Sequence, residues 1–238
     1  MKKNIFLYLG AAALTGMMLM AGCGMPGSSG SSAGQEDNPN NAMFSSTEDE
    51  PEAVQTADAQ EPRAVQSDTP EILTGLHHAQ IDVRDYGVIE VELDADTAPL
   101  TVTNFVKLAR SGFYDGLTFH RIISGFMIQG GDPLGNGRGG SDETIKGEFS
   151  SNGVENNITH ERGVISMARS SDPDSASSQF FIMHQKADYL DGEYAAFGHV
   201  TAGIEVVDKI CDDARPVDSN GTIEKENQPV IQSIKILD

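Results

Sequence analysis

One stretch, Phe119–Asp132, constrains the fold of this chain more than any other part of the sequence. Side chains two positions apart along an extended segment point to the same side. One parity of the stretch therefore carries Arg121, Ile123, Gly125, Met127 and Gln129. Because Ser124-Gly125 can bend the chain, the pattern predicts a guanidinium, an apolar wall and an amide that converge on one small patch.

The chain around this stretch is typical of strands and turns from Leu76 onward. One parity of the first part is apolar, namely Ile81, Val83, Ile89, Val91 and Leu93. Asp85-Tyr86-Gly87 lies between the two apolar runs as a turn. This alternation predicts a β-hairpin with one buried face.

Two segments show helical spacing instead. The first begins at Pro99, has Thr101 as a capping residue and an apolar stripe that includes Val102 and Phe105, and ends at Gly112. The second runs from Ile204 to Asp212 and is expected to bury Val207, Ile210 and Cys211. A last strand is expected around Val230–Leu237. Many short strands with two helices favour a mainly β fold, a barrel whose ends the helices close.

The N-terminus has the composition of an export signal. Lys2 and Lys3 precede a mainly apolar run that ends in Met20-Ala21-Gly22-Cys23. Small residues directly before a cysteine resemble the lipobox of bacterial lipoproteins, in which that cysteine is acylated and becomes the first mature residue. We therefore expect residues 1–22 to be a lipoprotein signal peptide and Cys23 to be the lipidation site. The alternative is an uncleaved transmembrane anchor, for which the run is short.

Residues 23–75 differ in composition from the rest. Positions 24–75 hold ten acidic residues and one basic residue, Arg63, and their only aromatic side chain is Phe44. Such a segment buries too little apolar surface to offset its chain entropy. We expect a disordered acidic linker rich in Ser, Gly and Pro, which holds the domain away from the membrane. A recognition tail for a partner is the alternative.

Several motifs after Leu76 resemble the cyclophilins, the peptidyl-prolyl cis/trans isomerases. The opening stretch matches along its whole length, and the glycine-rich loop Gly135–Gly140 follows it. Ser166–Arg169, Ser177–Ile182 and Tyr189–Tyr194 with Phe197–Val200 match later segments in the same order. The resemblance covers residues 76–238. It implies a closed antiparallel eight-stranded β-barrel capped by two α-helices, acting on X-Pro bonds (EC 5.2.1.8).

The resemblance also assigns roles to residues. It implies a catalytic set of Arg121, Phe126 and Gln129, with Arg121 bonding the prolyl nitrogen of a twisted amide. It implies a substrate-binding set of Met127, Gly137, Ala168, Arg169, Gln179, Phe181, Tyr189, Leu190 and Tyr194. Three of these depart from many eukaryotic members, which have tryptophan at Tyr189, histidine at Tyr194 and asparagine at Arg169.

Other kinds of site have little support. The formal net charge of −20 disfavours nucleic-acid binding, which needs clustered Lys and Arg. The histidines lack metal-ligand spacing, and bond rotation requires no cofactor, so we expect neither metal nor cofactor. Cys211 is expected to be a core residue rather than a nucleophile.

The sequence thus predicts a monomeric, lipid-anchored isomerase outside the cytoplasm, in the outer membrane if the host is Gram-negative. Its substrates would be Pro-containing segments of exported proteins. The alternative function is a non-catalytic scaffold or chaperone module that binds Pro-containing peptides.

Overall fold

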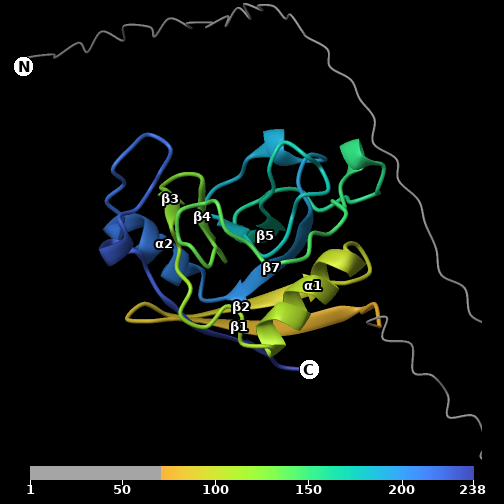
Figure 1. The fold of residues 1–238 in the computed structure, drawn as a ribbon, viewed down its shortest axis with the longest axis horizontal. Helices are drawn as coiled ribbons and strands as arrows, with labels where there is room; N and C mark the ends of the chain where they lie inside the picture. The colour runs from red at the N-terminus through yellow and green to blue at the C-terminus, as the bar shows by residue number, and fades with distance from the viewer. Residues whose placement is uncertain (1–70) are drawn as a thin grey trace, which may run out of the picture. The chain divides into compact units, whose positions relative to one another are not determined.

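The computed structural model describes residues 71–238, which form one eight-stranded antiparallel sheet with two α-helices (Figure 1). The strands are β1 (Leu76–Val83), β2 (Gly87–Asp94), β3 (Arg121–Ile123), β4 (Met127–Gly130), β5 (Val164–Met167), β6 (Phe180–Met183), β7 (Ala196–Ala202) and β8 (Ile231–Ile236). Their order across the sheet is β3-β4-β6-β5-β7-β2-β1-β8. The helices are α1 (Pro99–Arg110) and α2 (Ile204–Asp213).

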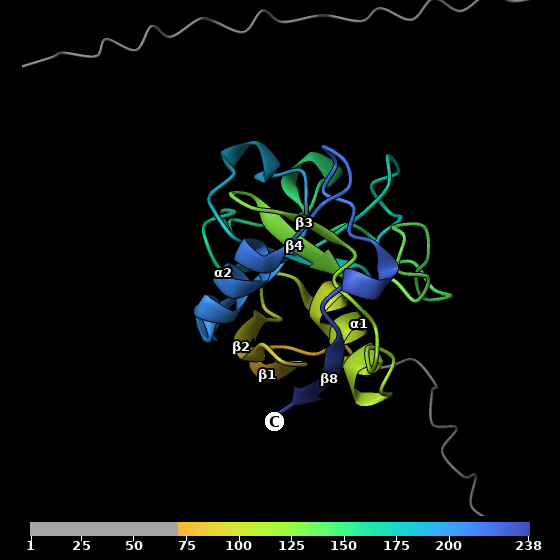
Figure 2. The ribbon, with the colours of Figure 1, turned by 90° about the vertical axis from the view of Figure 1, so that its left-hand side faces the viewer.

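The sheet is curled into a half-barrel, with the two helices at its opposite ends (Figures 1 and 2). Within residues 71–238 no ladder joins the edge strands β3 and β8. Isolated bridges link the segments beside them instead, between Thr118 and Val230 and between Arg121 and Thr222. The predicted eight antiparallel strands and two helices are confirmed, while the closure of the predicted barrel depends on these single bridges.

The predicted hairpin is confirmed in register and in burial. Strands β1 and β2 pair from Leu76 opposite Asp94 to Val83 opposite Gly87. The five alternating apolar side chains predicted to be buried are each at most 1% exposed, namely Ile81, Val83, Ile89, Val91 and Leu93. Asp85 adopts a φ of 66° in the turn, a left-handed conformation that Asp tolerates better than most residues.

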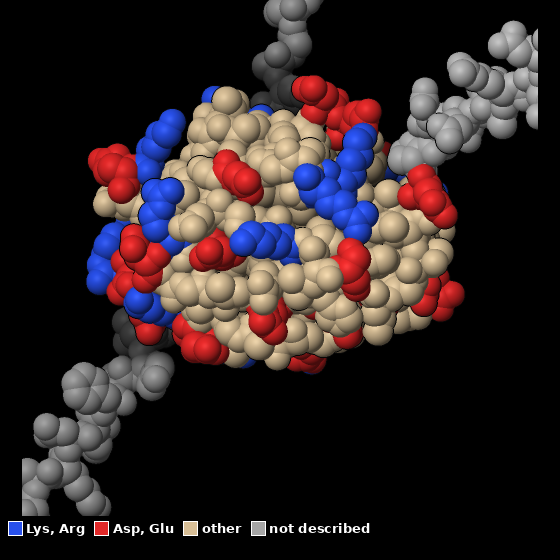
Figure 3. Space-filling view, turned by 90° about the horizontal axis from the view of Figure 1, so that it is seen from below, with Lys and Arg blue, Asp and Glu red and all other residues tan. Residues whose placement is uncertain are grey.

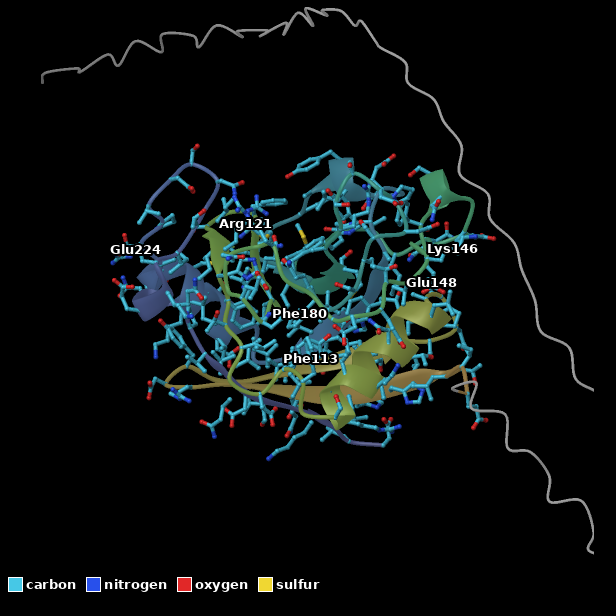
Figure 4. All side chains as sticks on the ribbon, in the orientation of Figure 1. Phe113, Arg121, Lys146, Glu148, Phe180 and Glu224 are labelled. Carbon is cyan, nitrogen blue, oxygen red and sulfur yellow. The ribbon has the colours of Figure 1, made fainter. Side chains whose placement is uncertain are left out.

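Helix α1 begins at Pro99, as predicted, but the prediction that Thr101 caps it is wrong. Its N-cap is Ala98, whose side chain makes no capping hydrogen bond. The buried carboxylate of Glu148 accepts hydrogen bonds from the N–H groups of Leu100 at 3.0 Å and Thr101 at 2.8 Å. The Thr101 hydroxyl donates to the same carboxylate at 2.6 Å. A residue 47 positions away thus satisfies the free N–H groups of the first turn (Figure 4).

Helix α2 matches the predicted span within one residue. It buries Val206, Val207, Ile210 and Cys211. Burial raises the pKa of the Cys211 thiol to about 12, with Asp208 and Asp212 acting in the same direction. The thiol is therefore protonated at neutral pH. Cys211 is only 4% exposed and packs in the main core, which confirms it as a core residue.

The main core is built around buried aromatic rings. Phe105 of α1 contacts Phe180 edge-on with ring centroids 5.5 Å apart, and Phe197 and Tyr114 at 5.3 Å and 5.2 Å. Figure 4 shows Phe180 in the interior between the strands and α1. Edge-to-face aromatic pairs add stability beyond the area they bury, so this cluster fixes α1 against the sheet.

The described residues begin slightly before the predicted domain start at Leu76. Leu73 packs against the core, and its N–H donates to the Thr103 hydroxyl at 2.9 Å. The predicted signal peptide and residues 23–70 of the predicted linker lie outside the described residues. No helix within residues 71–238 has the length and apolar character needed to cross a membrane. On the face that Figure 3 shows, acidic and basic side chains are interspersed.

The Glu148 cap yields a stability prediction. Replacing Glu148 with Gln places an amide N–H₂ group among donors and removes the buried charge that faces the helix N-terminus. We expect Glu148→Gln to lower the free energy of unfolding by about 1–3 kcal/mol in urea denaturation. The control is Glu143→Gln, an exposed carboxylate 2.8 Å from Lys107, for which we expect a change below about 1 kcal/mol. Equal effects of the two variants would contradict the cap.

Candidate active site

The site is positioned by the register of β3, β4 and β6. Arg121 lies opposite Gln129 in the β3–β4 pair, and Ile123 lies opposite Met127. Gln129 in turn lies opposite Phe181 of β6. Gly125 makes the turn between β3 and β4 with a φ of 81°, a left-handed conformation that favours glycine. The predicted convergence of guanidinium, apolar wall and amide is therefore confirmed.

A cavity of about 270 Å³ opens over these strands. It brings together ten of the residues that the sequence singled out, so segments far apart in the chain meet at one place. Its lining residues are Arg121, Phe126, Met127, Gln129, Ala168, Arg169, Phe181, Tyr189, Leu190 and Tyr194. A second hydrophobic cluster, separate from the main core, forms its floor. The buried members of this cluster are Met127, Val164, Phe181, Met183, Ala187, Leu190 and Ala196.

Arg121 is half-buried at the edge of this cavity (Figure 4). Its Nε donates to the Asn220 carbonyl at 2.7 Å and its Nη1 to Oε1 of Gln129 at 3.1 Å. Its Cζ lies 5.9 Å from the centroid of the Phe126 ring. Burial lowers the pKa of Arg121 from its usual value, but an arginine side chain keeps its charge at neutral pH.

Two tyrosines lie at the rim of the cavity, Tyr189 and Tyr194, at the two positions where the resemblance led us to expect tryptophan and histidine. Tyr189 is 70% exposed, and its ring lies 5.9 Å from that of Phe126. Tyr194 contacts Phe181 edge-on at 5.9 Å. The guanidinium of Arg169 lies 4.8 Å from the Tyr194 ring and 5.1 Å from the Phe149 ring. Arg169 therefore supports the Tyr194 ring by cation–π contact, so two of the three departures form one structural unit.

A second cavity, of about 410 Å³, adjoins the first. Gln129, Ala168 and Arg169 line both cavities, and the second contains the predicted Gly137 and Gln179. The two glutamines connect them, since Nε2 of Gln129 donates to Oε1 of Gln179 at 2.9 Å. Every predicted substrate-binding residue thus lines one of the two cavities.

A buried histidine supports the cavity floor from behind. The ring of His160 stacks on Phe181 with centroids 6.0 Å apart and an interplanar angle of 16°. Its Nδ1 lies 2.9 Å from Oδ1 of Asp191, and its Nε2 lies 3.1 Å from the Ser166 hydroxyl. Asp191 also accepts the His160 backbone N–H at 2.7 Å. His160 therefore ties the loop after Leu190 to β5 and to Phe181.

Asp132 and Asp191 are structurally important residues to which the sequence analysis gave no role. Asp132 is 1% exposed and accepts the N–H groups of Leu134, Asn136 and Gly137 at 2.6–3.0 Å. An aspartate three residues before a glycine-rich loop is the signal that predicts such a contact.

Four histidines of the domain differ in their burial. His160 and His120 are buried, His184 is half-buried and His199 is exposed. Neither ring nitrogen of His120 has a hydrogen-bond partner in the part of the chain that is described, and burial lowers its pKa. Between residues 71 and 238 no group of three or more His, Cys, Asp or Glu could hold a metal.

The burial of His160 predicts a pH dependence of stability. Burial lowers the pKa of His160 below 6.5 in the folded chain, although Asp191 opposes this shift. The unfolded chain therefore takes up this proton at a higher pH than the folded chain. We expect the free energy of unfolding to fall as the pH drops below about 6.5, by up to about 1.4 kcal/mol per pH unit, until folded His160 is protonated.

Urea denaturation across this pH range tests the assignment. His160→Gln should make the slope less steep, whereas His199→Gln, a change at an exposed histidine, should leave it intact. His120 contributes equally to the slope in both variants. An unchanged slope in His160→Gln would show that another group takes up the proton.

Comparison with known proteins agrees with this geometry. Residues 78–238 match the family model "Cyclophilin type peptidyl-prolyl cis-trans isomerase/CLD". Peptidyl-prolyl cis-trans isomerase B of Bacillus subtilis is 46% identical over 144 residues, which are 60% of this chain and 92% of that protein. A peptidyl-prolyl cis-trans isomerase of Helicobacter pylori is 47% identical over 126 residues, covering 52% of this chain and 74% of that protein.

A solved structure gives the same result. A cyclophilin-type isomerase of Cryptosporidium parvum superposes with a TM-score of 0.60 at 32% identity and covers 68% of this chain and 99% of its own. The range that the family model matches includes the strands that carry Arg121, Gln129 and Phe181. The chain belongs to the cyclophilin-type peptidyl-prolyl cis-trans isomerases, and its activity is the cis-trans isomerisation of X-Pro peptide bonds (EC 5.2.1.8).

Proposed function

We propose that this isomerase is an exported lipoprotein, anchored to a membrane through acylated Cys23, which accelerates the folding of exported proteins. The observation that carries the proposal is Met20-Ala21-Gly22-Cys23 directly after an apolar run that Lys2 and Lys3 precede. The acidic segment that follows is long enough to separate an anchored residue from the catalytic domain. Uncatalysed prolyl isomerisation takes tens to hundreds of seconds and limits the folding of many proteins, so an isomerase outside the cytoplasm has substrates.

Within the domain, we propose that the smaller cavity holds the proline ring. Its floor of Met127, Phe181 and Leu190 is apolar and at most 6% exposed, which suits a hydrocarbon ring. The Cryptosporidium parvum relative was solved in the presence of the dipeptide Ala-Pro, which supports a proline ligand for this fold. Ala168 and Arg169 lie between the two cavities and would contact the peptide on either side of the proline.

Catalysis requires that the enzyme bind the twisted amide more tightly than either planar isomer. Amide resonance gives the uncatalysed rotation a barrier of about 18–20 kcal/mol. Rotation breaks this resonance and returns the lone pair to the prolyl nitrogen, which becomes a hydrogen-bond acceptor only near the transition state. A fixed guanidinium that donates to this nitrogen therefore stabilises the transition state selectively.

Arg121 is the residue we assign to this role. Its Nε and Nη1 donate to Asn220 and Gln129, which hold the guanidinium in place. Its Nη2 has no acceptor within residues 71–238 and remains available to a substrate. Phe126 lies against the guanidinium and forms the cavity wall, and Gln129 orients it. Because no covalent bond is broken, none of these residues needs to act as a nucleophile.

The lipoprotein assignment is tested by labelling the full-length chain with a palmitate analogue in a bacterial host. We expect label and membrane fractionation in the wild type, and loss of both in Cys23→Ser. Cys211→Ser is the matched control, because the other cysteine is buried in the domain and should leave both readouts unchanged. A Cys23→Ser chain that stays in the membrane and retains residues 1–22 would show an uncleaved anchor instead.

The proposed role in folding is tested with an exported protein whose refolding has a slow prolyl phase. We expect the domain to shorten this phase, and Arg121→Ala to remove most of the effect. A slow phase that the active domain leaves unchanged, while X-Pro peptides are isomerised, would contradict the role in folding but not the activity.

A further inference from the structure

We propose that the larger cavity selects an acidic side chain close to the proline of the substrate, and that Arg138 is the residue that determines this specificity. The inference rests on the proposed binding of proline in the smaller cavity. It adds a substrate class, peptides with Asp or Glu near the isomerised bond, to the established activity.

The two cavities are close enough for one peptide to occupy both. The two cavities are adjacent, because Gln129, Ala168 and Arg169 line both of them. An extended chain advances about 3.3 Å per residue, and its successive side chains point in different directions. A peptide whose proline fills the smaller cavity therefore places a side chain a few positions away in the larger one.

The lining of the larger cavity is polar and small, and it lacks carboxylates. Three glycines and four serines contribute most of it, namely Gly137, Gly139, Gly140, Ser141, Ser170, Ser175 and Ser177. Among residues 71–238, the charged residues that line it are Arg138 and Arg169. In a chain with a formal net charge of −20, this is a locally cationic site with hydroxyl groups, a combination that favours a carboxylate.

Of the two arginines, Arg138 is the one available to a ligand. Arg169 donates to the carbonyls of Glu193 at 3.0 Å and Ser170 at 2.9 Å, and it lies 3.5 Å from the Glu193 carboxylate. The Arg138 side chain is exposed and has no hydrogen bond or ion pair within residues 71–238. A ligand carboxylate would therefore be its first charged partner in this part of the chain.

The loop that carries Arg138 is held in a fixed conformation. Burial opposes ionisation of Asp132, but backbone N–H groups including those of Leu134, Asn136 and Gly137 outweigh it and hold the pKa of Asp132 below its usual value. The charged carboxylate thus organises the loop up to the residue before Arg138. A β-carbon at Gly139 would clash with Oδ1 of Asp132, so only glycine allows the loop to approach this carboxylate so closely. Because the loop is already ordered, binding of a ligand costs little conformational entropy.

The same loop is connected to the catalytic arginine by hydrogen bonds. Nε2 of Gln179 donates to the Gly139 carbonyl at 2.7 Å, and Oε1 of Gln179 accepts from Gln129 at 2.9 Å. Gln129 accepts from Arg121 at 3.1 Å. A carboxylate that binds beside Gly139 would therefore also stabilise the chain of contacts that positions Arg121.

Nearby carboxylates do not compete for Arg138 within the described region. Asp142 and Glu143 follow the loop but line a different cavity against α1. Glu143 is bonded to Lys107 at 2.8 Å, and Glu193 faces Arg169. The positive charge of Arg138 therefore remains uncompensated by ion pairs in residues 71–238.

The experiment measures cis-trans exchange by NMR for peptides with one proline among alanines, in which one alanine at a time is replaced by Glu or by the neutral isostere Gln. The domain is used with its wild-type sequence and as Arg138→Gln, Arg138→Glu and Arg84→Gln. Arg84 is the control, an exposed arginine in the turn after β1 that lines neither cavity.

We expect the wild type to favour Glu over Gln at one position by about two- to fivefold in kcat/KM, the size of a partly exposed ion pair. The preference should disappear in Arg138→Gln, reverse in Arg138→Glu, remain in Arg84→Gln and weaken with added salt. If the wild type isomerises the all-alanine peptide but prefers Glu nowhere, or if Arg138→Gln keeps the preference, the inference is overturned. If the wild type isomerises no peptide, the assignment of the smaller cavity to proline fails first.

Discussion

The hydrogen bond between Arg121 and Gln129 is the interaction on which the rest of the site depends. It exists because β3 and β4 pair in a register that sets the two residues opposite each other. The bend at Gly125 fixes that register, since a slip of one residue would turn Arg121 away from the cavity and bring Ile122 toward it. The position of the guanidinium is thus set by backbone pairing and by its hydrogen bonds to Gln129 and Asn220.

The buried apolar residues form two clusters, one that packs the helices against the sheet and one that lies beneath the smaller cavity. The larger cluster, with Phe105 and Phe180, packs α1 and α2 against the sheet and lies away from solvent. The smaller one, with Met127 and Phe181, forms the cavity floor. Because Phe180 and Phe181 are neighbours on β6, their side chains point to opposite faces of the strand. Two adjacent residues of β6 therefore contribute to different clusters, one to the core and one to the cavity floor.

Much of the fold could be predicted, because it follows from the spacing of apolar residues along short segments of the sequence. Alternation predicted the hairpin and the shared face of Arg121 and Gln129, and helical spacing predicted α1 and α2 within one or two residues. The motif order placed the cavity residues correctly as a group. The hairpin, the shared face and the helices involve residues that are near one another in the chain, where the geometry of a strand or helix fixes relative positions. The cavity residues are far apart in the chain, and only the resemblance to the cyclophilins grouped them.

The contacts that sequence analysis missed join distant segments. Glu148 caps a helix 47 positions away, and Asp191 holds His160 across 31 positions. Neither carboxylate has a local pattern that identifies its partner, because the barrel brings the two segments together only after folding. The capping role predicted for Thr101 was wrong for the same reason, since a buried acceptor from another segment replaced the local one.

The central claim is that a fixed Arg121 guanidinium stabilises the twisted X-Pro amide. The most direct test compares cis-trans exchange of an X-Pro peptide by the wild-type domain and by Arg121→Ala, with circular dichroism to show that both are folded. We predict at least about a tenfold fall in kcat/KM, equivalent to about 1.4 kcal/mol of transition-state stabilisation. A folded Arg121→Ala domain with undiminished exchange would contradict the claim, and a wild-type domain that binds the peptide without accelerating exchange would point to a scaffold that only binds proline.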